Sequence, residues 1–138
     1  MQENSSFISF ENNTSGLIFD DSSHPRFPIR YYNLINGEGL EAKENCSYFF
    51  YVYEGSLEIL NPEWPFFKQG VSEFCYATAN NIAGINGSGK SIAIEVSNET
   101  GSYRESNYKS YNMVGGPIEE NGRLKYIDGC TDSLLISP

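Results

Sequence analysis

The stretch Tyr48–Leu60, which reads YFFYVYEGSLEIL, decides the fold class of this chain. Its first six residues are all aromatic or β-branched, which is typical of a strand that packs on both faces. Its last five, Ser56–Leu60, alternate between polar and apolar residues with the period of two of a half-buried strand. Glu54-Gly55 lies between the two parts and predicts a two-residue turn. We therefore expect a β-hairpin here.

Outward from this hairpin, other short apolar or alternating stretches are separated by residues that favour turns. In Ser91–Ser97, for example, Ile92, Ile94 and Val96 fall on one face and the small or polar residues on the other. No long window has helical periodicity, so the chain is expected to be all-β, a sandwich or a barrel. The other predicted strands are Phe7–Phe10, Gly16–Phe19, Ile29–Ile35, Phe74–Ala79, Leu124–Ile127 and Leu134–Ile136.

Composition limits the partners and the compartment. The 138 residues fit one domain, with residues 1–6 expected to be loose and residues 98–138 to form a long loop and terminal strands. The net charge is −9, and no cluster of Lys and Arg is present, which argues against nucleic acid and membrane surfaces. Three widely spaced cysteines, and no signal-like N-terminus, predict reduced thiols in the cytoplasm.

The segment Gly84–Ser91, GINGSGKS, matches the phosphate-binding pattern G-x-x-x-x-G-K-[ST] in full. In a true phosphate-binding loop a helix follows, and its N-terminal amides face the anion. Here the residues after Lys90 alternate as a strand, and the chain has no βαβ units. We therefore reject nucleotide hydrolysis and expect a glycine-rich hairpin turn that joins two strands.

Three features of the chain resemble the cupin family. Tyr51–Ile59 resembles the strand–Glu-Gly–strand segment that closes the first cupin motif, and Gly70 resembles the glycine that opens the second. Ile92–Val96 resembles the strand after that motif, so the resemblance covers roughly residues 29–97. It implies a small antiparallel β-barrel, the double-stranded β-helix or jelly roll, which commonly pairs through sheet edges. A homodimer is therefore expected.

The resemblance also implies where a metal would bind. Cupins typically hold it with two His, a Glu and a third His, and the only histidine here, His24, lies outside both motifs. We therefore expect no metal and no cofactor. The corresponding positions of this chain are Ala42 and Glu44 (or, with one more spacer residue, Glu41 and Lys43), Tyr48 and Asn81.

These positions define the candidate site. Glu44, Tyr48, Tyr76 and Asn81 are expected to face the barrel interior as ligand-binding residues, and no residue is predicted to be catalytic. The expected function is a metal-free module that binds a small molecule or serves structure and dimerisation. Two alternatives stay open. One is a metal-independent isomerase or epimerase of the sugar type, and the other is the non-catalytic half of a two-barrel enzyme.

Overall fold

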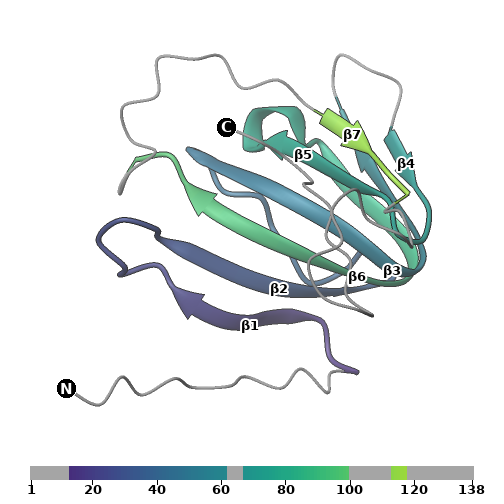
Figure 1. Cartoon of the computed structure of the whole chain (residues 1–138), viewed down its shortest axis with the longest axis horizontal. Coiled ribbons are helices and arrows are strands. Elements are labelled where there is room, and N and C mark those ends of the chain that lie inside the picture. Colours follow the sequence, from purple (N-terminus) through teal and green to yellow (C-terminus); the bar gives the residue numbers. More distant parts are fainter. Residues whose placement is uncertain (1–12, 62–66, 100–112, 118–138) are drawn as a thin grey trace, which may run out of the picture.

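The computed structural model describes residues 13–61, 67–99 and 113–117, and these form one antiparallel sheet (Figure 1). The strand order is β1-β2-β6-β3-β5-β7, and β4 pairs with β3 beside this path. A 3-10 turn, η1, follows β5. The elements are β1 (Gly16–Asp21), β2 (Ile29–Ile35), β3 (Cys46–Leu60), β4 (Phe67–Gln69), β5 (Phe74–Thr78), η1 (Ala79–Asn81), β6 (Gly84–Ser97) and β7 (Met113–Gly115).

The all-β, antiparallel class is confirmed, although the sheet formed by the described residues is curled and open rather than closed into a barrel. β1 and β7 lie at opposite ends of the strand order and do not pair with each other in this part of the chain. Of the predicted strands, Ile29–Ile35 has the bounds expected, Gly16–Phe19 extends to Asp21, and Phe74–Ala79 ends at Thr78. Outside the described residues lie the expected strands Phe7–Phe10, Leu124–Ile127 and Leu134–Ile136, the loose residues 1–6, and residues 100–112 and 118–138 of the expected loop and terminal strands. Within the expected loop, Met113–Gly115 forms the strand β7, which the sequence did not predict.

The two expected turns at the centre of the chain were wrong. β3 continues through Glu54-Gly55, and β6 continues through the whole glycine-rich segment. Gly55 and Gly89 face each other across the β3–β6 pair, with φ angles of 78° and 79°. Beside them, a bulge between Val52 and Glu54 shifts the register. Bulges and left-handed glycines bend a strand pair without reversing the chain, so what the sequence suggested as two turns is one shared bend.

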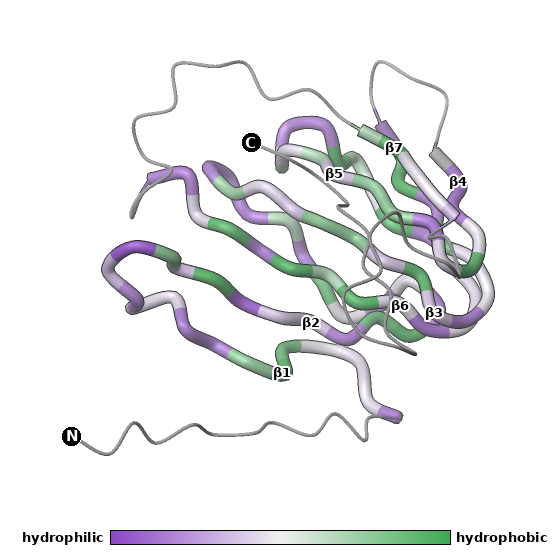
Figure 2. The backbone as a smooth tube through the Cα atoms, viewed as in Figure 1, coloured by the Kyte–Doolittle hydropathy of each residue, from purple (hydrophilic) through white to green (hydrophobic). Residues whose placement is uncertain are grey.

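The core lies on the inner face of this curled sheet. Along β3, the fully buried large hydrophobic side chains before the bulge are Tyr48, Phe50 and Val52, and those after it are Leu57 and Ile59. The extra residue in the bulge explains the change from even to odd numbers, because it keeps both series on the inner side. Figure 2 shows hydrophobic residues alternating with polar ones along β3 and β6, and further hydrophobic residues on β1 and β5. The other members of this cluster are Tyr32 and Leu34 from β2, Cys46 from β3, Cys75 from β5 and Ala93 from β6.

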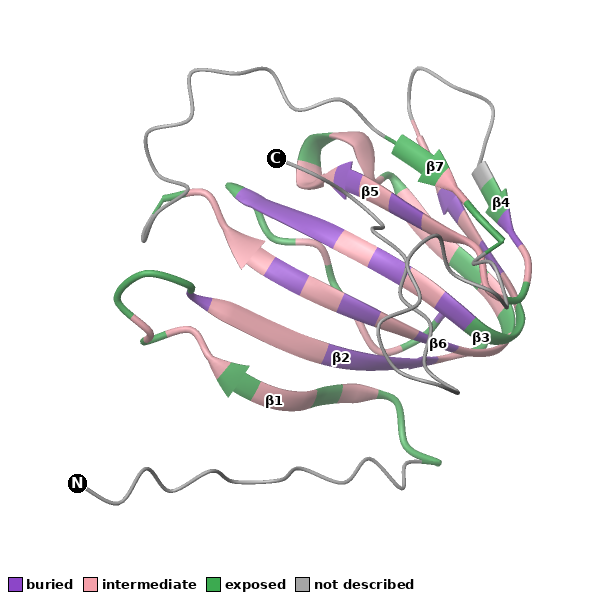
Figure 3. Cartoon of the chain, in the orientation of Figure 1, coloured by how far each residue is buried: buried purple, intermediate pink, exposed green. Residues whose placement is uncertain are grey.

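In its last part, Ser91–Ser97, β6 places small and polar residues inward and large apolar residues outward. Ser91, Ala93 and Glu95 are buried, whereas Ile92, Ile94 and Val96 are only partly buried (Figure 3). The predicted alternation of β6 is therefore present, but its smaller and more polar side contributes to the core. The partly buried face carries aromatic side chains from the neighbouring strands, including the ring pairs Phe19–Tyr31 and Phe49–Phe74.

Candidate functional site

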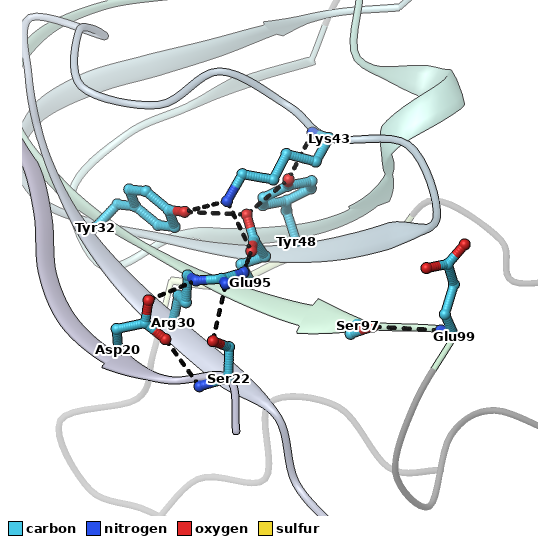
Figure 4. Close-up of polar contacts among 9 residues, drawn as sticks. All are labelled: Asp20, Ser22, Arg30, Tyr32, Lys43, Tyr48, Glu95, Ser97 and Glu99. Carbon is cyan, nitrogen blue, oxygen red and sulfur yellow. Dashed lines mark hydrogen bonds and ion pairs between the residues drawn. The ribbon is translucent and has the colours of Figure 1, made fainter. Parts of the chain in front are cut away.

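A row of four polar side chains crosses four strands on the inner side of the sheet. Asp20 in β1 is the register partner of Arg30 in β2, and Arg30 is the partner of Glu95 in β6. Glu95 in turn lies opposite Tyr48 in β3. Directly opposite residues of an antiparallel pair share a face and touch. The strand pairing therefore places these four groups together, as Figure 4 shows.

The carboxylate of Glu95 is the centre of this cluster, and only 2% of its side chain is exposed. Oε1 accepts a hydrogen bond from Arg30 Nη1 at 2.7 Å and from Lys43 Nζ at 3.3 Å. Oε2 accepts from the hydroxyls of Tyr48 at 3.0 Å and Tyr32 at 3.1 Å. An ionised carboxylate has about four acceptor positions. All of them are used, two by cations and two by phenols.

The two tyrosines and Lys43 are also bound to one another. The Tyr48 hydroxyl accepts a hydrogen bond from the Lys43 backbone N–H at 2.8 Å, while it donates to Glu95. Lys43 Nζ donates to the Tyr32 hydroxyl at 3.0 Å and lies 5.7 Å from the centroid of that ring. Lys43 comes from the segment before β3, so the cluster fastens this segment over the edge of the core. Its side chain is 49% exposed, so on this side the cluster reaches solvent through Lys43.

Arg30 extends the cluster toward the sheet edge. Its Nε donates to Asp20 Oδ2 at 2.9 Å, and its Nη2 donates to Ser22 Oγ at 2.8 Å. The Ser22 backbone N–H donates to the other Asp20 oxygen at 2.9 Å. Two cations, Arg30 and Lys43, therefore face two carboxylates, Asp20 and Glu95. The cluster is electrically balanced, which allows a buried charge to be tolerated.

The pKa shifts agree with this assignment of charges. Burial acts to raise the pKa of Glu95, but hydrogen bonds from Arg30, Tyr48 and Lys43 outweigh it, so the pKa is lowered. Burial is the main reason that the pKa values of Tyr32 and Tyr48 are raised. The hydrogen bond with Tyr32 is the main reason that the pKa of Lys43 is raised. At neutral pH the cluster thus holds an ionised Glu95, a protonated Lys43 and neutral phenols.

The four predicted site residues do not come together. Tyr48 lies in the cluster just described. Tyr76 is the register partner of Phe49 and so lies on the opposite face of the sheet from Tyr48. Glu44 is exposed in the segment before β3. Asn81 lies in η1, where its Nδ2 donates to Thr78 Oγ1 at 2.8 Å.

Sequence reasoning missed Glu95, the central group. The signal was available in Ser91–Ser97, because Glu95 shares a face with Ser91 and Ala93. A face of small residues allows close packing, and an acid on such a face needs cationic partners if it is buried. Lys43 was named only as an alternative position for one of the missing cupin histidines. Nothing in the local sequence pointed to Arg30. Arg30 is identified by its register opposite Glu95, and Lys43 by the position of the segment before β3, rather than by local sequence.

Two motifs set aside at the sequence level have structural roles. Lys90 of the GINGSGKS segment lies within β6, where its Nζ is 3.9 Å from Glu54 Oε2 and 3.4 Å from Asn13 Oδ1. Strand continues after it, so the helix N-terminus of a phosphate-binding loop is not formed. His24 lies in the β1–β2 loop, and its Nδ1 accepts hydrogen bonds from the backbone N–H groups of Arg26 and Phe27.

The cysteines and acids do not form a metal centre in the described part of the chain. Cys46 and Cys75 are free and buried, and Cys130 lies outside the described residues. In residues 13–61, 67–99 and 113–117, no three His, Cys, Asp or Glu side chains gather as a metal site would require. The same ranges contain no helix with the length and apolar character needed to cross a bilayer.

Comparison with known proteins gives no match to a family model, to a curated protein or to a solved structure. The cupin resemblance therefore stays a prediction, and the function has to be argued from the cluster itself.

Proposed function

We propose that this chain is a non-catalytic, cupin-like module that acts by binding, and that the Glu95 cluster serves its structure. The observation that carries the proposal is the set of four hydrogen bonds that saturates the Glu95 carboxylate. A general base needs a free acceptor position within reach of the proton it removes. Glu95 has all of its positions filled by groups of the same chain.

The isomerase or epimerase alternative receives less support. That chemistry uses a histidine base and a tyrosine acid, and His24 is held in a turn by two backbone N–H groups. Tyr48, the best-placed phenol, already donates its proton to Glu95 and accepts from Lys43. Raised pKa values in Tyr32 and Tyr48 also make them weaker acids than free tyrosine. The alternative of a non-catalytic half of a two-barrel protein is compatible with the same geometry.

Homodimerisation through a sheet edge is part of the proposal. β1, one edge strand among the described residues, ends in Asp20-Asp21, and charges on an edge disfavour pairing between chains. β7, at the other end of the strand order, contains no charge, and its Met113 and Val114 are 42% and 46% exposed. β7 is therefore the edge we expect to meet a second copy.

The dimer can be tested by measuring the mass of the protein in solution with light scattering. We expect a dimer for the original chain and a monomer for Val114→Lys, because a lysine on an edge strand opposes edge pairing. Val71→Lys is the control, because Val71 is similarly exposed at 53% but lies outside the edge strand. A monomer before any substitution contradicts this part of the proposal.

The structural role of Glu95 can be tested by equilibrium unfolding in urea. Polar residues of an active site commonly lower stability, so replacing them stabilises the protein. A carboxylate that holds buried partners behaves in the opposite way. We expect Glu95→Gln to lower the free energy of unfolding by about 3 kcal/mol, because Arg30 and the two phenols lose their charged acceptor.

Glu58→Gln is the matched control, since Glu58 lies in β3 away from the cluster. We expect it to change the stability by less than about 0.5 kcal/mol. An unchanged or higher stability of Glu95→Gln would contradict the structural role and favour the enzyme alternative.

A further inference from the structure

The side chain of Gln69, at the end of β4, is buried without any hydrogen bond. It is 0% exposed, and neither its Oε1 nor its Nε2 has a partner in the part of the chain that the structure describes. It differs in this from Glu95, which is equally deep but has every acceptor position filled. A buried primary amide has two donors and an acceptor to satisfy, and native proteins rarely leave such a group unpaired.

The position of Gln69 places this amide at the inside of the bend. Gln69 is the register partner of Leu57, which is buried in the core just after the bulge. The turn that follows, Gly70–Glu73, returns to β3 just before the bulge, where Ser72 N–H donates to the Val52 carbonyl and Val52 N–H to the Glu73 carbonyl. The segment from Gln69 to Glu73 thus spans the bend, and the amide lies on its inner side.

The inward-facing groups described around the bend do not supply a partner. Val52 and Leu57 are apolar and fully buried. Cys75 faces inward from β5, and burial alone raises the pKa of its thiol to about 12, as expected of a group in dry surroundings. A leucine or methionine in place of Gln69 would suit these surroundings better. The presence of an amide therefore calls for a partner that is not part of these residues.

We propose that Gln69 marks an internal binding site at the bend for a small polar molecule that offers a hydrogen-bond donor and an acceptor side by side. Water is the smallest molecule with this chemistry, and the amide or carboxylic acid group of an organic ligand is the larger one. The inference gives the proposed binding function a site and a class of ligand. It rests on that function only where the small polar molecule at Gln69 is treated as a ligand. It uses no residue of the Glu95 cluster, so the two fail separately.

The first test is urea unfolding of the full chain with Gln69→Met, which keeps the size of the side chain but removes its polar atoms. A bound partner predicts a loss of about 10-fold in the folding equilibrium constant, because its hydrogen bonds go with the amide. Lys68→Met, at the exposed neighbouring position, is the control and should leave the constant unchanged. An equal or higher folding equilibrium constant for Gln69→Met overturns the proposal, because it means that the amide has no bound partner and does not stabilise the fold.

The second test does not depend on a variant that folds. Native mass spectrometry of the purified protein, together with its crystal structure, identifies the partner. An added mass that is lost on unfolding, with density at Gln69 Oε1 and Nε2, indicates an organic ligand. Density for water alone, with no added mass, supports the water form of the site. A well-ordered crystal with no density at hydrogen-bonding distance from either atom overturns the proposal.

Discussion

The two halves of the β3–β6 pair are built from the same two strands but are held in register by different means. In the half formed by Cys46–Val52 and Ser91–Ser97, side chains make the specific contacts, with the polar row inside and aromatic pairs outside. In the half formed by Glu54–Leu60 and Gly84–Lys90, three glycines lie in β6 and the backbones approach closely. The pairing of the first half is held by contacts between side chains. The pairing of the second half requires glycines, because a Cβ atom there would meet the backbone of the facing strand.

The largest effect is expected where the two halves meet. Gly55→Ala should lower the free energy of unfolding by about 4 kcal/mol, because alanine is strained at a φ of 78° and its Cβ would clash with the Ser88 carbonyl oxygen. Urea unfolding measures the change. Gly70→Ala is the matched control, since the nearest atom to its Cβ would be 3.7 Å away. Similar losses of stability in both variants would mean that the bend at Gly55 does not require glycine more than the turn at Gly70 does.

Acid should weaken the first half selectively. The pKa of Glu95 is below its ordinary value of 4.5, so its contribution to stability is complete above pH 4.5 and is lost as the pH falls through the lowered folded-state pKa. Asp20 shifts in the same direction, mainly through hydrogen bonds from Ser22 and Arg30. Unfolding in urea from pH 7 down to pH 3 should therefore show falling stability.

The Glu95→Gln variant provides the check on this pH dependence. Because glutamine does not titrate, we expect a flatter acid limb for this variant than for the original chain. Parallel acid limbs would mean that other carboxyl groups, rather than Glu95, cause the loss.

The two phenols allow a finer comparison within the first half. Tyr48→Phe should cost about 2 kcal/mol, because it leaves the Lys43 N–H without its acceptor and removes one of the two donors to Glu95 Oε2. Tyr32→Phe should cost about 1 kcal/mol, since its hydroxyl has the longer bond to Glu95 and its other partner, Lys43, is half exposed. Thermal and urea unfolding of the two variants show which substitution lowers the stability more. The reverse order would place the centre of the cluster nearer β2.

The smallest effect is expected at the outer end of the polar row. Asp20→Asn removes an ion pair with Arg30 that is open to solvent, so the loss should be smaller than that of Tyr32→Phe and should shrink further in high salt. Stability measured at low and high ionic strength tests this. A loss as large as that of Tyr48→Phe, or one unaffected by salt, would show that the row acts as a single unit.

The sequence predicted the first half of the pair better than the second. Local alternation located the Ser91–Ser97 part of β6, and apolar stretches bounded by turn residues located β2 and β5, because both signals are properties of the chain itself. At Glu54-Gly55 and Gly84–Ser91 the same local rules gave two turns. A glycine favours a bend as well as a turn, and only the facing strand decides between them.

The candidate site was predicted only in part for a related reason. Tyr48 was found through the cupin resemblance, but Glu95, which accepts its hydrogen bond, and Arg30, which also donates to Glu95, come from two other strands, 65 positions apart. Which residue lies opposite which depends on register, and register is set over the whole sheet. Tyr76 shows the limit most clearly. It was assigned to the interior through spacing, and the pairing with Phe49 places it on the other face.

The bulge at Tyr53 changes the shape of β3 without changing which of its later side chains face the core. Val52 pairs with Ser91, and Glu54 pairs with Lys90, the next residue of β6, so Tyr53 is a one-residue insertion relative to its partner strand. Deleting it would restore an unbroken ladder and still leave Leu57 and Ile59 pointing inward. An ancestor or a redesign without this residue would thus keep the same inside and outside, and would lose the local irregularity that helps this sheet to curl.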